Sequence, residues 1–326
     1  MTQPAGPPTL RRHNLGLVLA ALRAAGGASR AELAARTGLT RATVATLVEP
    51  LLGAGVLIED AATPRGVGRP SRAVRFADGG PVALGVAVDV DTLAGCAVGL
   101  DGVVRAHRQR TRDHRALAPA AVFDGAGALP AQGRNNVGAR VLGVGLAPPA
   151  LLSRGSDAVR GAADGADDAR RPPGTDSPVV LRAPNLPRLD GCRPADALAD
   201  RLGFPVTVDN EATLGALAHL DLAPDLVYVS AGVGVGGGIV LGGRVYRGAR
   251  GLAGELGHVV VDRAGPACGC GGRGCVERYA GMTAVLADAG ATDLDPLAAA
   301  LARGEARAVA ATTRAAAPLG GGLASA

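Results

Sequence analysis

Residues 254–277 read GELGHVVVDRAGPACGCGGRGCVE, and this stretch gathers one imidazole and three thiols within a short span of sequence. The glycines between the cysteines allow the chain to turn tightly enough to bring the thiols together. One imidazole and three thiolates complete a closed tetrahedral shell, which is typical of structural rather than catalytic zinc. The alternative is a chance group of unligated thiols. We expect a structural Zn²⁺ site, whose ligands are His258, Cys268, Cys270 and Cys275.

Polar side chains that suit a sugar lie near these ligands in the sequence. Glu255 precedes His258, and Glu277 follows the last cysteine. Upstream, an apolar strand at 204–208 ends at Asn210-Glu211, where an alanine-rich helix begins. Carboxylates and amides that converge in a cleft suit paired hydrogen bonds to neighbouring sugar hydroxyls. Solvation of these groups on the surface is the alternative.

A strand followed by a hairpin occurs twice in the body of the chain. The apolar runs at 84–90, 94–100 and 103–109 predict strands, the last two joined by the turn signal Asp101-Gly102. The pattern returns at 226–246, with a Gly242-Gly243 turn. Two related α/β lobes with a ligand cleft between them are therefore expected.

The glycine run GVGVGGG at 232–238 formally contains a dinucleotide-binding fingerprint. That fingerprint requires a helix directly after the glycines, whereas a strand and a hairpin are predicted here, so we reject it. Two interpretations stay open. The backbone amides could cradle an anion, or the glycines could permit close approach of two backbones.

The first quarter of the chain has the pattern of a helix-turn-helix. Apolar residues at i, i+3, i+4 and i+7 from Leu15 predict a first helix. Ser29 and Glu32 form a capping box for a second, which stops at Gly38, and Thr40 caps a third. The third helix would enter the major groove of DNA. Its outward residues are Arg41, Thr43 and Thr46.

Two short strands at 56–58 and 73–76 look like a wing, and the basic tip between them includes Arg69. Residues 1–76 carry ten Arg against four acidic residues, whereas the remainder is nearly balanced, with 24 Arg and 25 acidic residues. A basic head on a neutral body is typical of a duplex-DNA binder with a second task. A three-helix bundle without a ligand is the alternative.

Composition sets the remaining expectations. Aromatic residues make up only 2% of the chain, which argues against stacking platforms for single-stranded nucleic acid. The chain has neither an apolar leader nor a membrane-length apolar run, so we expect a cytoplasmic protein with reduced thiols and no membrane contact. The expected domains are 1–76 and 81–326, with a solvated insertion at 153–178.

Several motifs resemble the ROK family of repressors and sugar kinases: GLAGELGHVVVD, CGCGGRGCVE, AGVGVGGGIVLGGRVYRGARG, APNL and FPVTVDNEATLGALA. TGLTRATV and GRP in the head are similar to its repressor branch. The resemblance implies an α/β protein in which a winged helix-turn-helix precedes a two-lobed, actin-like (hexokinase-type, ribonuclease H-like) domain, short at its C-terminal end. It implies a homodimer or homotetramer. The implied effector-binding residues are Asn185, Asn210, Glu211, Glu255, His258 and Glu277.

The chain departs from the kinase pattern at two functional positions. Kinase members carry Asp-x-Gly-Gly-Thr to hold the phosphates of ATP, whereas this chain has DVDTL at 89–93. Where the family has a catalytic Asp after an Asn, this chain has Glu211. A displaced general base and a phosphate loop without glycines both disfavour phosphoryl transfer. We expect a binding protein rather than an enzyme.

The sequence therefore predicts a sugar-responsive regulator of carbohydrate-metabolism genes, most simply a repressor. It would bind double-stranded operator DNA as a dimer and a sugar or sugar phosphate in the cleft. The main alternative is an ATP-dependent sugar kinase, glucokinase-like, that carries a DNA-binding head. Control by a protein partner in place of the sugar, and a non-functional remnant, are two further alternatives.

Overall fold

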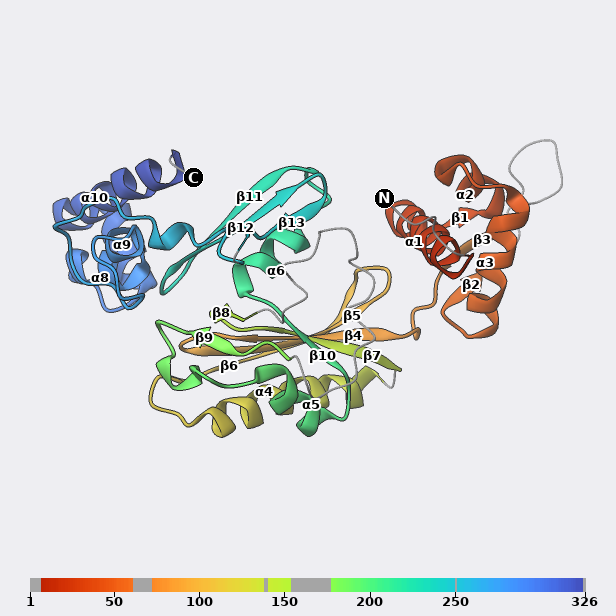
Figure 1. The fold of residues 1–326 in the computed structure, drawn as a ribbon, viewed down its shortest axis with the longest axis horizontal. Helices are drawn as coiled ribbons and strands as arrows, with labels where there is room; N and C mark the ends of the chain where they lie inside the picture. Colours follow the sequence, from red (N-terminus) through yellow and green to blue (C-terminus); the bar gives the residue numbers. More distant parts are fainter. Residues whose placement is uncertain (1–6, 61–71, 138–139, 154–176, 250, 325–326) are drawn as a thin grey trace. The chain divides into compact units, whose positions relative to one another are not determined.

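The computed structural model describes residues 7–60, 72–137, 140–153, 177–249 and 251–324 (Figure 1). The chain divides into two compact units. The first comprises Met1–Gly85, Gly95–Arg108 and Leu129–Val144, and the second comprises Val86–Ala94, Gln109–Ala128 and Gly145–Ala326. The division at 76/81 inferred from the sequence stays a prediction.

Three helices form the head, and local capping explains where two of them begin. The Ser29 hydroxyl accepts a hydrogen bond from the Glu32 amide (3.3 Å), and the Glu32 carboxylate accepts one from the Ser29 amide (2.7 Å). This confirms the predicted capping box. Thr40 caps the third helix by accepting from the Thr43 amide at 3.1 Å. The helices are α1 (Pro7–Ala25), α2 (Arg30–Thr37) and α3 (Arg41–Gly53).

The wing strands pair as predicted. β2 (Leu57–Glu59) and β3 (Ala73–Phe76) are antiparallel, and β1 (Ala28–Ser29) completes a sheet of order β1-β3-β2. The head core draws on all three helices and the wing, which fixes the helices against the sheet. Its most buried side chains are Val18, Leu22, Leu33, Val44, Val48, Leu57 and Val74. Arg69 and the rest of the predicted tip lie outside the described residues.

A five-stranded sheet of order β10-β7-β4-β5-β6 follows the head. In β4 every second side chain from Val82 to Val88 is buried, so the apolar run supplies the core on one side of the strand. Helices α4 and α5 cover one face of the sheet (Figure 1), joined by Arg201 Nε to Asp124 Oδ1 at 2.6 Å. The bounds are β4 (Val82–Val88), β5 (Thr92–Gly99), β6 (Val104–Thr111), α4 (Pro119–Val137), β7 (Val141–Ala147), α5 (Pro194–Leu202) and β10 (Val206–Val208).

A small strand pair lies beside the predicted insertion. β8 (Leu151–Leu152) pairs with β9 (Val180–Arg182), and the short helix η3 (Pro187–Leu189) follows. Residues 154–176 of the predicted insertion lie outside the described residues.

The second predicted hairpin forms a separate antiparallel sheet of order β11-β12-β13. Its strands are β11 (Leu226–Ala231), β12 (Val235–Leu241) and β13 (Arg244–Tyr246), and α6 (Glu211–Ala218) packs against it. A Cβ on Gly237 would lie 2.5 Å from the Gly254 carbonyl oxygen, and one on Gly238 would lie 2.6 Å from that of Ala212. Gly237 and Gly238 of β12 therefore permit close packing of two backbones, which is one of the two interpretations left open by the sequence, while an anion at the loop amides stays a prediction.

The chain then continues into short helices. The turn η4 (Leu256–His258) and helix α7 (Glu277–Ala280) flank the cysteine loop, and α8 (Met282–Ala289), α9 (Leu294–Ala302) and α10 (Ala306–Ala324) follow. Helix α10 contacts both α7 and α8. These contacts attach the loop to the helical end of the chain.

Candidate functional site

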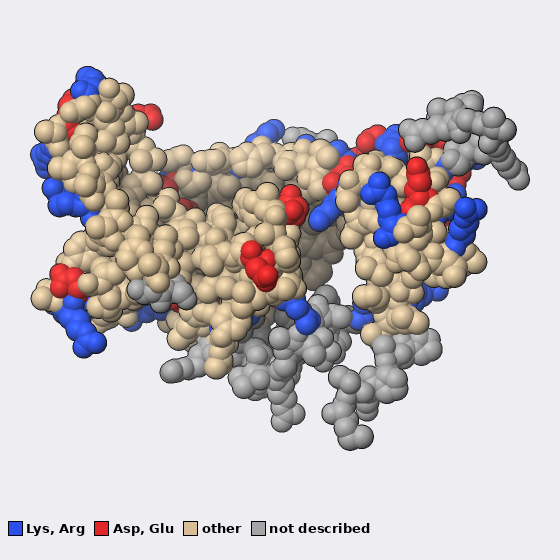
Figure 2. Space-filling model, turned by 90° about the horizontal axis from the view of Figure 1, so that it is seen from above, with Lys and Arg blue, Asp and Glu red and all other residues tan. Residues whose placement is uncertain are grey.

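The third helix of the head presents one unpaired cation. Arg41, the first residue of α3, is exposed, and it has no ion-pair partner among the described residues. It lines an open hollow of about 460 Å³ together with Arg30 and Arg72. Both of those arginines contact Glu59, Arg30 at 2.5 Å and Arg72 at 3.4 Å. In Figure 2 both arginine and acidic side chains lie on the surface of the head.

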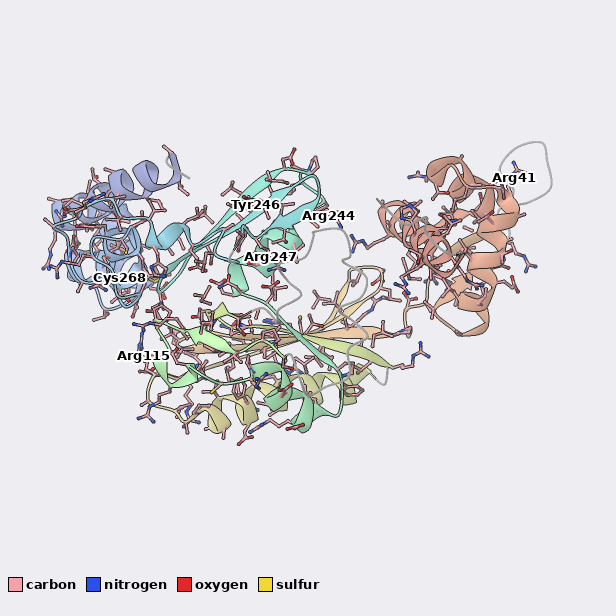
Figure 3. All side chains as sticks on the ribbon, viewed as in Figure 1. Arg41, Arg115, Arg244, Tyr246, Arg247 and Cys268 are labelled. Carbon is pink, nitrogen blue, oxygen red and sulfur yellow. The ribbon has the colours of Figure 1, made fainter. Side chains whose placement is uncertain are left out.

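The two threonines predicted to read DNA are already engaged within the helix. The Thr43 hydroxyl lies 2.9 Å from that of Thr40, and the Thr46 hydroxyl donates to the Ala42 carbonyl at 3.0 Å. Each of these threonines could still offer a base its methyl group and a second lone pair of its hydroxyl oxygen. Arg41 is therefore the strongest candidate on this helix, and its position is labelled in Figure 3. DNA contact by these residues stays a prediction.

The predicted metal ligands come together. The ligand atoms of His258, Cys268, Cys270 and Cys275 all lie within 4.8 Å of one another. Cys268 Sγ lies 3.7 Å from His258 Nδ1, and Cys270 Sγ lies 3.7 Å from Cys275 Sγ. Ligands about 2.3 Å from a tetrahedral zinc ion are about 3.8 Å apart, so this donor set fits the ion. Figure 3 labels Cys268 at this cluster.

Gly274 lets the cysteine loop close. Its φ is +63°, and a Cβ there would lie 1.5 Å from the Asp262 carbonyl oxygen. Its carbonyl accepts from the Val261 amide at 2.9 Å, and an isolated bridge pairs Val260 with Cys275. Burial and the neighbouring thiols raise the pKa of Cys275 to about 12, so this thiol keeps its proton until a cation displaces it.

Two predicted sugar-contacting side chains meet at the start of β12. Glu277 Oε2 accepts from the Val235 amide at 3.0 Å. A Cβ on Gly234 would lie 2.2 Å from that same oxygen and 3.0 Å from Asn185 Nδ2. Glycine at 234 thus leaves room for both side chains, which arrive from segments far apart in sequence.

Two more predicted sugar-contacting carboxylates, Glu255 and Glu211, have raised pKa values. Burial raises the pKa of Glu255, the His258 charge lowers it, and the negative charge of Glu277 raises it. Burial is also the largest cause that raises the pKa of Glu211, and the negative charges of Asp89 and Glu255 raise it further. A hydrogen bond with Ser230 lowers this pKa. We call Asp89, Glu211, Glu255 and Glu277 the carboxylate cluster. Such a cluster can accept several hydrogen bonds from hydroxyls.

Asn210 has a structural task at the start of α6. Its Oδ1 accepts from the amides of Ala212 (2.9 Å) and Thr213 (3.2 Å), and its Nδ2 donates to the Ala150 carbonyl (3.3 Å). The side chain therefore fixes the helix that carries Glu211. Direct contact of Asn210 with a sugar stays a prediction, as it does for the other five residues proposed from the sequence.

Sequence reasoning missed the ion pair that supports this helix start. Arg247 forms a two-pronged pair with Asp209, with Nη1 3.0 Å from Oδ1 and Nη2 against Oδ2. Asp209 Oδ1 also accepts from the Asn210 amide at 2.9 Å. Figure 3 shows Arg247 beside α6. An acidic residue at a strand end next to Asn-Glu was the one available signal.

The turn that replaces the glycine-rich phosphate loop is closed on itself. The Asp89 amide donates to the Thr92 carbonyl (2.8 Å), and the Val90 amide donates to Asp89 Oδ1 (2.6 Å). Val90 is buried, at 1% exposure. Two amides of the turn are thus occupied within it, and the two positions that are glycine in the kinase motif are Asp91 and Thr92 here.

Removing the charge of Glu211 is expected to stabilise the protein at high pH. A carboxyl whose pKa is raised on folding penalises the folded state above that raised pKa, and the penalty disappears as pH falls below the ordinary value of 4.5. Glu211→Gln should therefore melt higher than wild type at pH 8, with a difference that shrinks toward pH 4. Thermal unfolding at several pH values measures this. Glu49→Gln, at a side chain 76% exposed, is the control, and equal melting of Glu211→Gln and wild type at pH 8 would contradict the prediction.

Among the helices that the structure describes, none combines the length and the apolar character needed to cross a bilayer.

Comparison with known proteins places both parts of the chain. A model described as the ROK family matches residues 83–326, and one described as winged helix-turn-helix DNA-binding matches residues 11–58. The xylose repressor of Bacillus subtilis (strain 168) is 26% identical over 268 residues, covering 79% of this chain and 63% of that protein. The chain spans between 32% and 63% of the length of the curated repressors that it matches.

Solved structures agree on the fold. A ROK family transcriptional regulator, a homolog of the E. coli MLC protein, superposes with a TM-score of 0.71 at 23% identity, covering 97% of this chain and 80% of that one. A ROK hexokinase from Thermus thermophilus gives 0.54 at 28% identity, covering 75% and 76%. These matches confirm the predicted α/β class, a winged helix-turn-helix followed by a sugar-kinase-like domain.

Proposed function

The chain belongs to the ROK family, and from that membership we propose that it is a sugar-responsive, DNA-binding transcriptional repressor that does not phosphorylate its sugar. The observation that carries this proposal is the pairing of two features in one chain. A winged helix-turn-helix presents the free cation Arg41, and a ligand site retains its carboxylates beside a closed Asp89–Thr92 turn. Curated relatives named xylose repressors also support a role as a sugar-responsive repressor.

The head would bind operator DNA through α3. Arg41 would contact a guanine edge or a phosphate, while Thr43 and Thr46 would pack against bases and Arg69 would reach the minor groove. Helix-turn-helix proteins bind as dimers to two-fold half-sites about one helical turn apart. We therefore infer a homodimer, or a homotetramer built from such dimers, on a pseudo-palindromic operator in the cytoplasm.

The sugar would bind at the carboxylate cluster. Glu211, Glu255 and Glu277 offer acceptors for vicinal hydroxyls, and Asn185 offers both a donor and an acceptor. Asn210 and the Asp209–Arg247 pair hold the start of α6 in place. A sugar changes DNA affinity only if it binds the DNA-bound and free states with different affinity.

His258 would link this site to zinc. Its Nδ1 faces Cys268 Sγ at 3.7 Å, so a bound ion would be held by this nitrogen together with Cys268, Cys270 and Cys275. The Nε2 atom then stays available to a ligand hydroxyl near Glu255. We infer that zinc is structural, because four protein donors close its coordination shell.

Selection from a random duplex pool tests the DNA proposal. The full chain should enrich a sequence with two-fold symmetry, and one sugar of a panel that includes xylose and glucose should release it. Binding measured at several salt concentrations separates specific from phosphate-only contact. Failure to bind any duplex at low salt would overturn the proposal.

A sugar kinase with a DNA-binding head is the second candidate, favoured by the 28% identity to the Thermus hexokinase and by the buried carboxylate of Glu211. On our proposal, ATP consumption stays at background with every hexose, because the phosphate loop has lost its glycines and Asp91 adds a second carboxylate that would repel phosphate. Turnover that disappears in Glu211→Ala would establish the kinase instead.

A further inference from the structure

A cavity beside the end of β6 is separate from the carboxylate cluster. Its volume is about 360 Å³, at the lower end of the range of small-ligand pockets, about 300–1,000 Å³. Its lining comes from β5, from the end of β6 with the segment that follows, and from α4. The lining residues are Leu93, Arg110, Thr111, Arg112, His114, Leu117, Ala121 and Gly125. None of them belongs to the site described above.

His114, which lines this cavity, carries a buried ring nitrogen without a hydrogen-bond partner in the described structure. The residue is 2% exposed, and its Nδ1 lies 2.7 Å from the Asp89 carbonyl oxygen. Because a carbonyl can only accept, Nδ1 donates to it, and in the tautomer protonated at Nδ1 alone Nε2 is an acceptor. Within the described part of the chain, Nε2 has no hydrogen-bond partner. Buried polar atoms without a partner are rare, which points to a donor supplied from outside the protein.

Two guanidinium groups adjoin the same cavity. Arg110 and Arg112 are exposed, and neither has a carboxylate or hydrogen-bond partner for its side chain among the residues described. The neighbouring Arg115, labelled in Figure 3, differs because it pairs with Asp113 at 3.2 Å. Unpaired arginines two residues apart suit a carboxylate or phosphate, which the planar guanidinium binds in two-pronged fashion.

The rest of the lining is aliphatic. Leu93 is 5% exposed, and a Cβ on Gly125 would lie 2.9 Å from its Cδ1. Leu117 and Ala121 complete the apolar part. A carbon skeleton can pack here between the acceptor and the cations.

We propose that this cavity binds a small hydroxylated anion, either a hydroxy acid or a polyol phosphate. The anionic group pairs with Arg110 and Arg112, and a hydroxyl donates to His114 Nε2. The carbon skeleton packs against Leu93 and Leu117.

The site has a direct connection to the closed turn. The His114 amide donates to the Val90 carbonyl and the Arg112 amide to the Asp91 carbonyl, both at 2.8 Å. A ligand that contacts His114 and Arg112 therefore contacts the segment that holds Asp89, whose charge acts on Glu211. Occupancy of the cavity is positioned to influence the carboxylate cluster.

Calorimetry on the full chain at low salt tests the ligand class with matched pairs. L-malate and succinate differ in one hydroxyl, and glycerol 3-phosphate and glycerol differ in the anion. Malate, glycerol 3-phosphate or both should bind, with succinate at least tenfold weaker than malate and glycerol not binding. The preferred anion then distinguishes a hydroxy acid from a polyol phosphate. No binding of either hydroxylated anion would overturn the proposal, as would equal binding of malate and succinate.

Variants then locate the site. Arg110→Gln and Arg112→Gln should each weaken binding about ten- to hundredfold, because each removes a charge-assisted contact. His114→Asn keeps a donor toward Asp89 but removes Nε2, so it should abolish the preference for malate over succinate. Arg115→Gln, the matched control, should bind as wild type does. If Arg110→Gln and Arg112→Gln bind normally while their melting is unchanged, the site is refuted, whatever the buried His114 variant does.

Discussion

Cys270→Ser is expected to leave the chain without stoichiometric zinc and to unfold the loop between η4 and α7. The four ligand atoms lie within 4.8 Å of one another, and four of the six residues between Cys268 and Cys275 are glycine. Such a segment has little apolar surface of its own to bury, so metal binding supplies much of its folding free energy. In zinc-finger peptides that contribution is about 10–16 kcal/mol. Metal analysis after dialysis, with hydrogen exchange over residues 258–281, measures both effects.

Cys192→Ser is the matched control for that experiment. Cys192 is a cysteine outside the cluster, with its Sγ 4.0 Å from the Arg188 carbonyl oxygen. Its replacement should change neither metal content nor exchange. The loss of metal should also weaken sugar binding, because His258 and Glu277 flank the loop. Full metal content in Cys270→Ser would remove the zinc site from the proposal.

Arg41→Ala should produce the second large effect, on DNA affinity. A two-pronged contact to a guanine is worth about 1–3 kcal/mol at each half-site, so a dimer on two half-sites should lose roughly thirtyfold or more. Melting of the protein should not change, because the Arg41 side chain is exposed and has no ion-pair partner in the described structure. Mobility shift with the selected duplex measures the loss.

Arg36→Ala separates a specific contact from a general loss of charge. Arg36 is exposed in the last turn of α2, so the two variants remove the same charge from neighbouring helices. It should reduce affinity only slightly and by a similar factor for every duplex. Equal losses in the two variants would show that α3 is not the recognition helix.

The parts of the fold that follow local rules could be predicted from sequence. The capping box at Ser29 and Glu32, the cap at Thr40 and both hairpin turns depend on residues a few positions apart. The cluster of one imidazole and three thiols was also predictable, because only nine residues lie between His258 and Cys268. Each of these features is fixed by chain geometry that the neighbouring residues set themselves.

The features that sequence could not supply depend on distant partners. Asp209 and Arg247 are 38 residues apart, and nothing in either segment names the other. His114 looks like one residue of a basic run, and only the fold shows that its ring is buried against Asp89. The engaged amide of Asn210 is a similar case, since its partner Ala150 is 60 residues away.

The glycines of β12 carry a consequence for how this protein can evolve. A methyl group at 237 or 238 would overlap main-chain oxygens of other segments, which cannot rotate away as a side chain would. If the carboxylate cluster holds a sugar, a lineage could change its preference by exchanging the carboxylates themselves. It could not do so by enlarging residue 237 or 238, because the backbone packed against them leaves no room for a side chain.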